Sequence, residues 1–250
     1  MDVEKFLAYI KQNPGSLKEW IKDGQDIFDT HLGEPFKKAR EAGEIPKDTR
    51  MGGAWHTLTE AGEANDINVT RLYGYDPTDV RDLTKAEIEG RQHVMWAIDA
   101  LKKYTPGFEN ARLRTFAMSI GTRESRKILG EYNITEDDVK NQARFEDAIG
   151  IFPDFLDAYG VVHIPTEGHY FQIPYGIVLP QKVENLLVAG RCVSGDKISH
   201  AATRQMMCCA VTGQGAGVAA AVSLKDDTTC RDVNISRVQN ALESQGVRIR

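Results

Sequence analysis

Apolar positions near the start of the chain repeat with the spacing of short helices. Residues 2–12 place their apolar side chains on one side of a helix, and a Pro-Gly pair then breaks the pattern. A second helix is expected to begin after Ser16, because Glu19 stands at the capping-box spacing. Residues 30–65 are rich in glycine, proline and charge, which predicts loops and short strands.

The clearest helical pattern lies in the middle of the chain. Thr84 and Glu87 have capping-box spacing, and apolar residues then recur on one face for about twenty residues until Pro106-Gly107. Alternating apolar positions predict strands at residues 68–73 and 113–120.

The second half of the chain is expected to end in a strand, a loop and a long helix. Thr135 is placed to cap a helix from about Glu136, and residues 161–180 read as a hairpin or two strands limited to edges by their prolines. The apolar run at residues 186–189 predicts a strand, and residues 205–224 predict a buried helix.

This order of elements predicts an α/β fold in three parts. Residues 1–180 form a mixed α+β substrate or cap region, residues 181–225 a terminal strand-loop-helix unit, and residues 226–250 a tail helix. One such unit cannot make a sheet alone, so its partner strands are expected earlier in the chain or outside it.

Composition narrows the possible partners. The chain has 250 residues, a net charge of −5 and a sequence pI of about 5.7, which gives no electrostatic reason to expect nucleic acid or an anionic membrane as a partner. The four cysteines fit no zinc or iron–sulfur spacing, and no signal peptide is visible. We therefore expect a cytoplasmic protein with reduced thiols.

The loop that follows residues 186–189 is the strongest candidate for a ligand site. Ligands of open α/β sheets bind beyond the carboxyl ends of the strands, and Gly190 lets a backbone approach a planar ligand closely. The following helix presents a positive N-terminus. The alternative is a plain buried helix, because a G-x-G-x-G run inside a helix is not a dinucleotide fingerprint.

Several motifs resemble FAD-dependent oxidoreductases of the heterodisulfide-reductase-A-like group. They are NLLVAGRC at residues 185–192, GQGAG at residues 213–217 and the R-E-S-R run at residues 123–126. Two departures are Met207, where a proline is usual, and Gly195-Asp196-Lys197, which replaces a commoner Ala-Thr-His.

The resemblance implies FAD as the cofactor and a Rossmann-like FAD-binding domain of which residues 181–225 are the terminal βα unit. The matched positions are then the cofactor-binding candidates: Gly190, Arg191, Cys192, Ser194, Arg204, Gly213 and Gln214. It also implies an oxidoreductase that transfers a hydride between the flavin and a small organic substrate.

The Gly-rich unit that opens such folds is not found in this sequence. The FAD/NAD(P)-binding fold is therefore expected to be incomplete, with the rest supplied by a missing N-terminal domain or a separate nucleotide-binding subunit. The alternative is a non-catalytic subunit or binding module that kept the scaffold without the cofactor.

Four polar residues are the candidates for chemistry outside the loop. Arg123 and Arg126 suit an anionic substrate or cofactor phosphate, or else tie a strand end to nearby loops. His200 is the candidate for proton transfer beside the flavin, and Tyr175 for a hydrogen bond to a substrate carbonyl. No metal site is expected, because Pro165 and Gly168 oppose the helix that the spacing of the nearby histidines and Glu167 would need. A third interpretation is a hydrolase that uses Ser194 or Ser199 with His200, but the lack of a G-x-S-x-G elbow around either serine argues against it.

Overall fold

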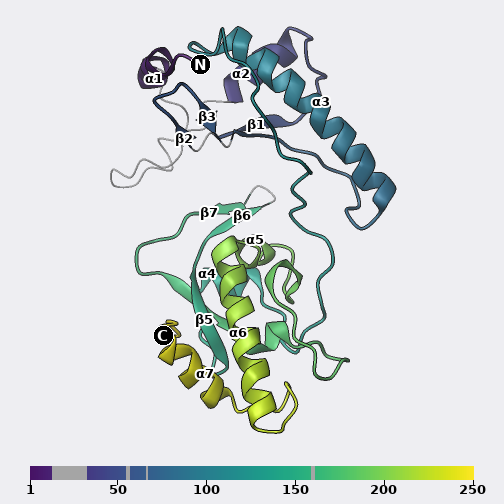
Figure 1. Cartoon of the computed structure of the whole chain (residues 1–250), viewed down its shortest axis with the longest axis vertical. Helices are drawn as coiled ribbons and strands as arrows, with labels where there is room; N and C mark the ends of the chain where they lie inside the picture. The colour runs from purple at the N-terminus through teal and green to yellow at the C-terminus, as the bar shows by residue number, and fades with distance from the viewer. Residues whose placement is uncertain (13–32, 55–56, 66, 159–160) are drawn as a thin grey trace. The chain divides into compact units, whose positions relative to one another are not determined.

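The computed structural model describes residues 1–12, 33–54, 57–65, 67–158 and 161–250. The chain forms two compact units, Met1–Thr122 and Arg123–Arg250 (Figure 1). The division falls at residue 122, not at the expected residue 180, because strands before residue 180 pack on the long C-terminal helix. The helix expected after Ser16 lies outside the described residues.

The N-terminal unit packs helices against two small antiparallel strand pairs, β1 with β4 and β2 with β3. Phe6, Phe36 and Leu101 are almost fully buried at its centre. The predicted helix at residues 2–12 and the strand at 68–73 are confirmed in outline, whereas α2 was not predicted. The elements are α1 (Val3–Gln12), α2 (Gly33–Glu41), β1 (Met51–Ala54), β2 (Thr57–Leu58), β3 (Ala64–Asn65), β4 (Asn68–Thr70) and α3 (Val80–Tyr104).

The long helix α3 is confirmed, but it begins earlier than its pattern predicts. The Asp79 carboxylate accepts hydrogen bonds from the backbone N–H groups of Arg81 and Asp82, so Asp79 is the N-cap. The predicted capping box is wrong, because the Thr84 hydroxyl donates to the carbonyl of Val80 inside the helix.

The strand predicted at residues 113–120 is wrong. This segment has no regular secondary structure, and Met118 is almost fully exposed. Its alternating pattern finds no neighbouring strand among the described residues, and Arg91 and Glu87 of α3 bind its backbone instead.

The C-terminal unit combines two further antiparallel pairs with a long helix. Strand β5 (Ala148–Pro153) pairs with β8 (Tyr170–Pro174), and β6 (Leu156–Ala158) pairs with β7 (Val161–His163). Two strands in the region 161–180 are thus confirmed, but each pairs with an earlier strand that was not predicted. The other elements are α4 (Glu136–Lys140), η2 (Tyr175–Val178), η3 (Gly190–Cys192), α5 (His200–Thr203), α6 (Met206–Lys225) and α7 (Ile235–Ser244).

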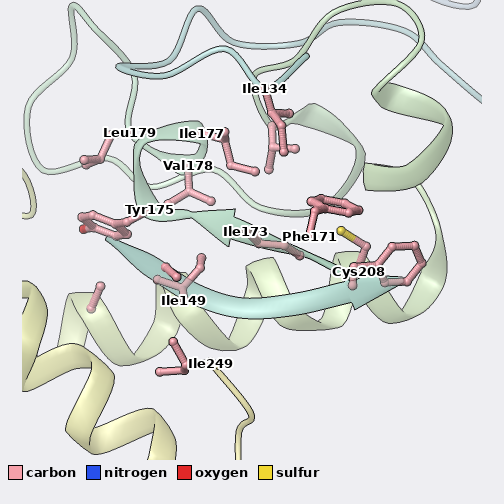
Figure 2. Close-up of a cluster of buried hydrophobic side chains, with 14 of the residues drawn as sticks. Ile134, Ile149, Phe171, Ile173, Tyr175, Ile177, Val178, Leu179, Cys208 and Ile249 are labelled. Atoms are coloured by element: carbon pink, nitrogen blue, oxygen red, sulfur yellow. The ribbon is translucent and has the colours of Figure 1, made fainter. Parts of the chain in front are cut away.

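Helix α6 packs closely on β5 to form the core of this unit. A Cβ added to Gly215 would lie 2.5 Å from Ile149 Cδ1 and 2.9 Å from Ile149 Cβ, so only glycine permits this approach. Ile149, Phe171 and Cys208 belong to the buried cluster shown in Figure 2. The close packing of α6 on β5 therefore explains why a glycine stands at position 215.

The apolar run Leu186 to Ala189 is not a strand in the structure, which corrects the predicted terminal βα unit. The Val188 N–H donates to the carbonyl of Val178, but no described strand pairs with the run, and Leu186 is exposed. The fold as described is a mixed helix and small-sheet structure, consistent with an α/β class.

Helix α6 has one buried and one exposed face. Among the described residues, it is the one helix whose length and apolar composition would suffice to cross a membrane. Core helices meet the same criteria, and Cys208, Thr212 and Ala219 of α6 are buried in the C-terminal unit. Met206 and Leu224, by contrast, are exposed.

Two cysteines of this unit are expected to react very differently with an alkylating reagent. Cys192 is exposed, whereas Cys208 is fully buried and burial raises the pKa of its thiol. Mass spectrometry after brief treatment of the native protein with iodoacetamide should find Cys192 modified and Cys208 unmodified. Denatured protein is the control, in which both should react. Rapid native labelling of Cys208 would contradict the packing of α6 described here.

Candidate functional site

Two arginines from distant segments meet on strand β6. Nη2 of Arg204 lies 2.8 Å from the carbonyl oxygen of Asp157, and Nη2 of Arg123 lies 3.1 Å from the same atom. Both also approach the Asp157 carboxylate, at 3.5 Å and 3.2 Å. The structure thus brings together Arg123, expected to bind substrate, and Arg204, expected to bind cofactor.

His200 joins this cluster from the start of α5. Its side chain is buried, and its Nε2 lies 3.3 Å from the backbone carbonyl oxygen of Arg123. Nδ1 is buried without a partner in the structure. Burial lowers the pKa of His200, partly offset by the Arg123 carbonyl, so the imidazole is neutral at pH 7.

The Gly190 loop lies against the first half of α6. Gly190 has a φ of 76°, and its N–H donates to the Thr212 hydroxyl at 2.9 Å. A Cβ at this position would lie 4.0 Å from Cys209 Sγ, an ordinary van der Waals distance, so the positive φ and not crowding favours glycine here. Arg191 and Cys192, which follow, are exposed.

The two motif segments that carry the family resemblance lie side by side. The backbone N–H of Ile128 donates to the carbonyl of Cys192 at 3.0 Å. The Lys127 ammonium donates to the carbonyls of Gly195 and Asp196 at 2.7 and 3.0 Å. The segment after Arg123 therefore supports the loop after Gly190.

Asp196 organises the loop that departs from the family pattern, a role that the sequence did not reveal. Its carboxylate accepts backbone N–H groups of Glu136, Ile198 and Ser199 at 2.9, 2.9 and 2.6 Å. Burial alone would raise the pKa of Asp196, but these donors outweigh it and hold the pKa below the usual value. The carboxylate thus joins the start of α4 to the start of α5.

Replacing Asp196 with alanine is expected to lower the free energy of unfolding by about 2 kcal/mol, because three backbone donors lose a charged acceptor. Since the folded pKa is depressed, the stabilisation is present above the unfolded pKa of about 3.9 and is lost as pH falls through the folded value. Urea unfolding at pH 7 and at lower pH measures both effects. The control is Asp137→Ala, an exposed aspartate of α4. Equal losses for the two variants would contradict the role of Asp196.

Other candidates lie apart from the arginine cluster. Tyr175 is buried, and its hydroxyl donates to the carbonyl of Cys230 at 2.7 Å, so it is engaged in the core and not offered to a substrate. Ser194 is buried and its hydroxyl donates to Asn133. Gln214 is exposed and donates to Gln245, next to an exposed Gly213 with open space around its Cα.

The histidines after β6 form a separate group. His163 Nε2 lies 2.8 Å from the buried carboxylate of Asp154, and His169 Nδ1 lies 3.6 Å from the same oxygen. In the part of the chain that the structure describes, no three His, Cys, Asp or Glu side chains are arranged to hold a metal ion. Asp154 was not predicted, because its partners His163 and His169 lie on later segments that only folding brings next to it.

The chain matches a known protein family. Residues 5–242 match the family described as FAD dependent oxidoreductase. No curated protein and no solved structure matches the chain. The match spans both units and includes Arg123, Gly190, His200 and Arg204. The chain therefore belongs to the FAD-dependent oxidoreductase family.

Proposed function

We propose that this chain transfers a hydride between FAD and a small organic substrate, with the reaction at the cluster of Arg123, Arg204 and His200. Oxidoreductase chemistry and FAD follow from the family. The observation that carries the proposal is that Arg123 and Arg204 both contact Asp157 of β6, while His200 contacts the backbone of Arg123. Buried proton donors and fixed cations are what a redox cofactor needs from its protein.

The residues present fit a flavin nucleotide. Gly190 has a positive φ that favours a residue without a side chain, and the buried His200 Nδ1 lacks a partner among the described residues. Gly190, Arg191, Cys192 and Arg204 are the residues that would hold FAD. When bound, FAD supplies a ring that takes up or releases a hydride.

The protein's own groups have three tasks in this proposal. Arg204, with a side chain only 15% exposed, orients an anionic group of a ligand. His200, neutral because of its burial, takes up or releases a proton at Nδ1. Thr212 fixes the N–H of Gly190, which holds the loop in place.

We further propose that a nucleotide-binding unit with a parallel sheet, from another domain or subunit, covers residues 186–189. The backbone N–H groups of Leu186 and Leu187 find no partner among the described residues, and the run is partly exposed. The run ends at Gly190, whose N–H donates to Thr212 of α6, and the exposed face of α6 carries small and apolar residues, including Met207, Gly213 and Leu224. Unpaired backbone and exposed apolar surface favour an added strand.

Titration with FAD tests the proposal. Flavin fluorescence should be quenched as FAD binds the chain, alone or mixed with its nucleotide-binding partner, and Gly190→Val should weaken binding at least tenfold. Gly168→Val is the matched control, since Gly168 also has a positive φ but lies outside the site. No binding in either form would favour the alternative, a non-catalytic subunit or binding module that kept this scaffold.

We place the protein in the cytoplasm. Cys192, Cys208, Cys209 and Cys230 all carry free thiols. A reducing compartment keeps thiols in this form.

A further inference from the structure

Arg123 and Arg204 are each anchored at one nitrogen. In both side chains Nη2 is the atom that contacts Asp157, while Nη1 and Nε contact no partner among the described residues. A guanidinium carries five N–H donors in a fixed plane. Most donors of both arginines therefore remain available to a ligand.

The charge of this cluster is not balanced by Asp157. One carboxylate, 50% exposed, faces two guanidinium groups at 3.2 and 3.5 Å. Such a partly solvated pair contributes little stability, so an incoming anion loses little by competing with it. The carbonyl of Asp157 holds the two Nη2 atoms independently of the carboxylate.

We propose that an oxyanion, a carboxylate or a phosphate, binds between Arg123 and Arg204 on their free Nη1 and Nε donors, and that the Asp157 carboxylate opposes it. The forked guanidinium edge matches both groups. Because Nη2 is already held by Asp157, each arginine side chain loses less conformational freedom when the oxyanion binds. The inference rests on the proposed function for its biological setting, but the binding itself needs no flavin.

The source of the oxyanion is either the substrate or the cofactor. His200 hydrogen-bonds to the main chain of Arg123, which places a group with proton-transfer chemistry beside the site. A carboxylate there would belong to a substrate acid, whereas a phosphate would belong to the cofactor. Two small probes, succinate and inorganic phosphate, separate these sources.

Isothermal titration of the full chain without flavin tests the inference. At least one probe should bind, and Arg123→Gln and Arg204→Gln should each weaken it tenfold or more. Asp157→Asn should bind about tenfold more tightly, because a like charge is removed while the carbonyl anchor stays. Arg237→Gln is the matched control, an exposed arginine of α7 that pairs with Asp226 and not with Asp157, and should bind as the unaltered chain does.

Succinate binding alone would support the inference with a substrate acid as the source, and phosphate binding alone would support it with the cofactor as the source. The inference would be overturned if neither probe binds, or if Asp157→Asn binds the probe no more tightly than the unaltered chain does. Near-UV circular dichroism identifies variants that misfold. If Arg204→Gln does not fold, because the Arg204 side chain is largely buried, Asp157→Asn still tests the inference. FAD binding without oxyanion binding would overturn this inference and leave the proposed function standing.

Discussion

Replacing Gly215 with leucine is expected to lower the free energy of unfolding by about 3 kcal/mol. Even a single Cβ at this position would lie 2.9 Å from Ile149 Cβ. The Cβ of Ile149 is bonded directly to the backbone of β5, so it cannot move away without moving the strand. Helix α6 would have to shift away from β5, and Phe171 and Cys208 lie in the same cluster (Figure 2). Urea denaturation followed by far-UV circular dichroism measures the loss.

Gly217→Leu is the matched control for this variant. Gly217 lies two residues further along α6, is exposed, and has open space where a Cβ would stand. Leucine is a better helix former than glycine, so this variant should be more stable by about 0.5–1 kcal/mol. If both variants lose stability equally, the close contact of α6 with β5 is not what limits position 215.

Replacing His200 with glutamine is expected to reduce kcat about 100-fold, with KM changed much less. Glutamine Nε2 can still donate to the Arg123 carbonyl, as His200 Nε2 does, but the titrating ring and its Nδ1 are lost. Because burial lowers the pKa of His200, the acidic limb of the pH–rate profile should lie below the usual histidine value of about 6.5, and it should vanish in the variant.

His169→Gln serves as the control, since His169 is half-exposed and contacts Asp154 instead of the arginine cluster. Its kcat and pH profile should match those of the unaltered protein. If kcat is unchanged in His200→Gln, His200 does not transfer a proton in the reaction and has only a packing role.

Local patterns were sufficient for several of the helices, although α2 was not predicted. The spacing of apolar residues predicted α1 and α3, and a long run of apolar and small residues predicted α6. Thr135 was correctly placed as the cap of α4, whose capping box is completed by Asp138. These features depend on neighbours three or four residues away, which a single sequence displays directly. Strand pairing depends on distant partners, so β5 and β6 were missed and the 113–120 segment was assigned wrongly.

In the candidate site, too, some residues were indicated by local motifs and others were found only in the folded structure. The motifs indicated Arg123, Gly190 and Arg204 because their spacing resembles a family, and the family match supports that resemblance at the level of FAD-dependent oxidoreductases. Asp157 and Asp196 had no local signal. Each has a partner at least 34 residues away in sequence, Arg123 for Asp157 and Glu136 for Asp196, which only the folded chain brings near.

The visible absorbance spectrum of the protein, purified without denaturation together with any chain that accompanies it, shows directly whether a flavin is bound. We expect the absorbance bands of a bound flavin, which fade when a reductant is added. We also expect weaker bands in Arg204→Gln than in Arg237→Gln, because Arg204 is anchored within the site, whereas Arg237 is an exposed residue of α7 that pairs with Asp226. A protein that is colourless as purified, and colourless again after incubation with FAD and removal of the unbound FAD, would contradict the assignment of FAD to this chain.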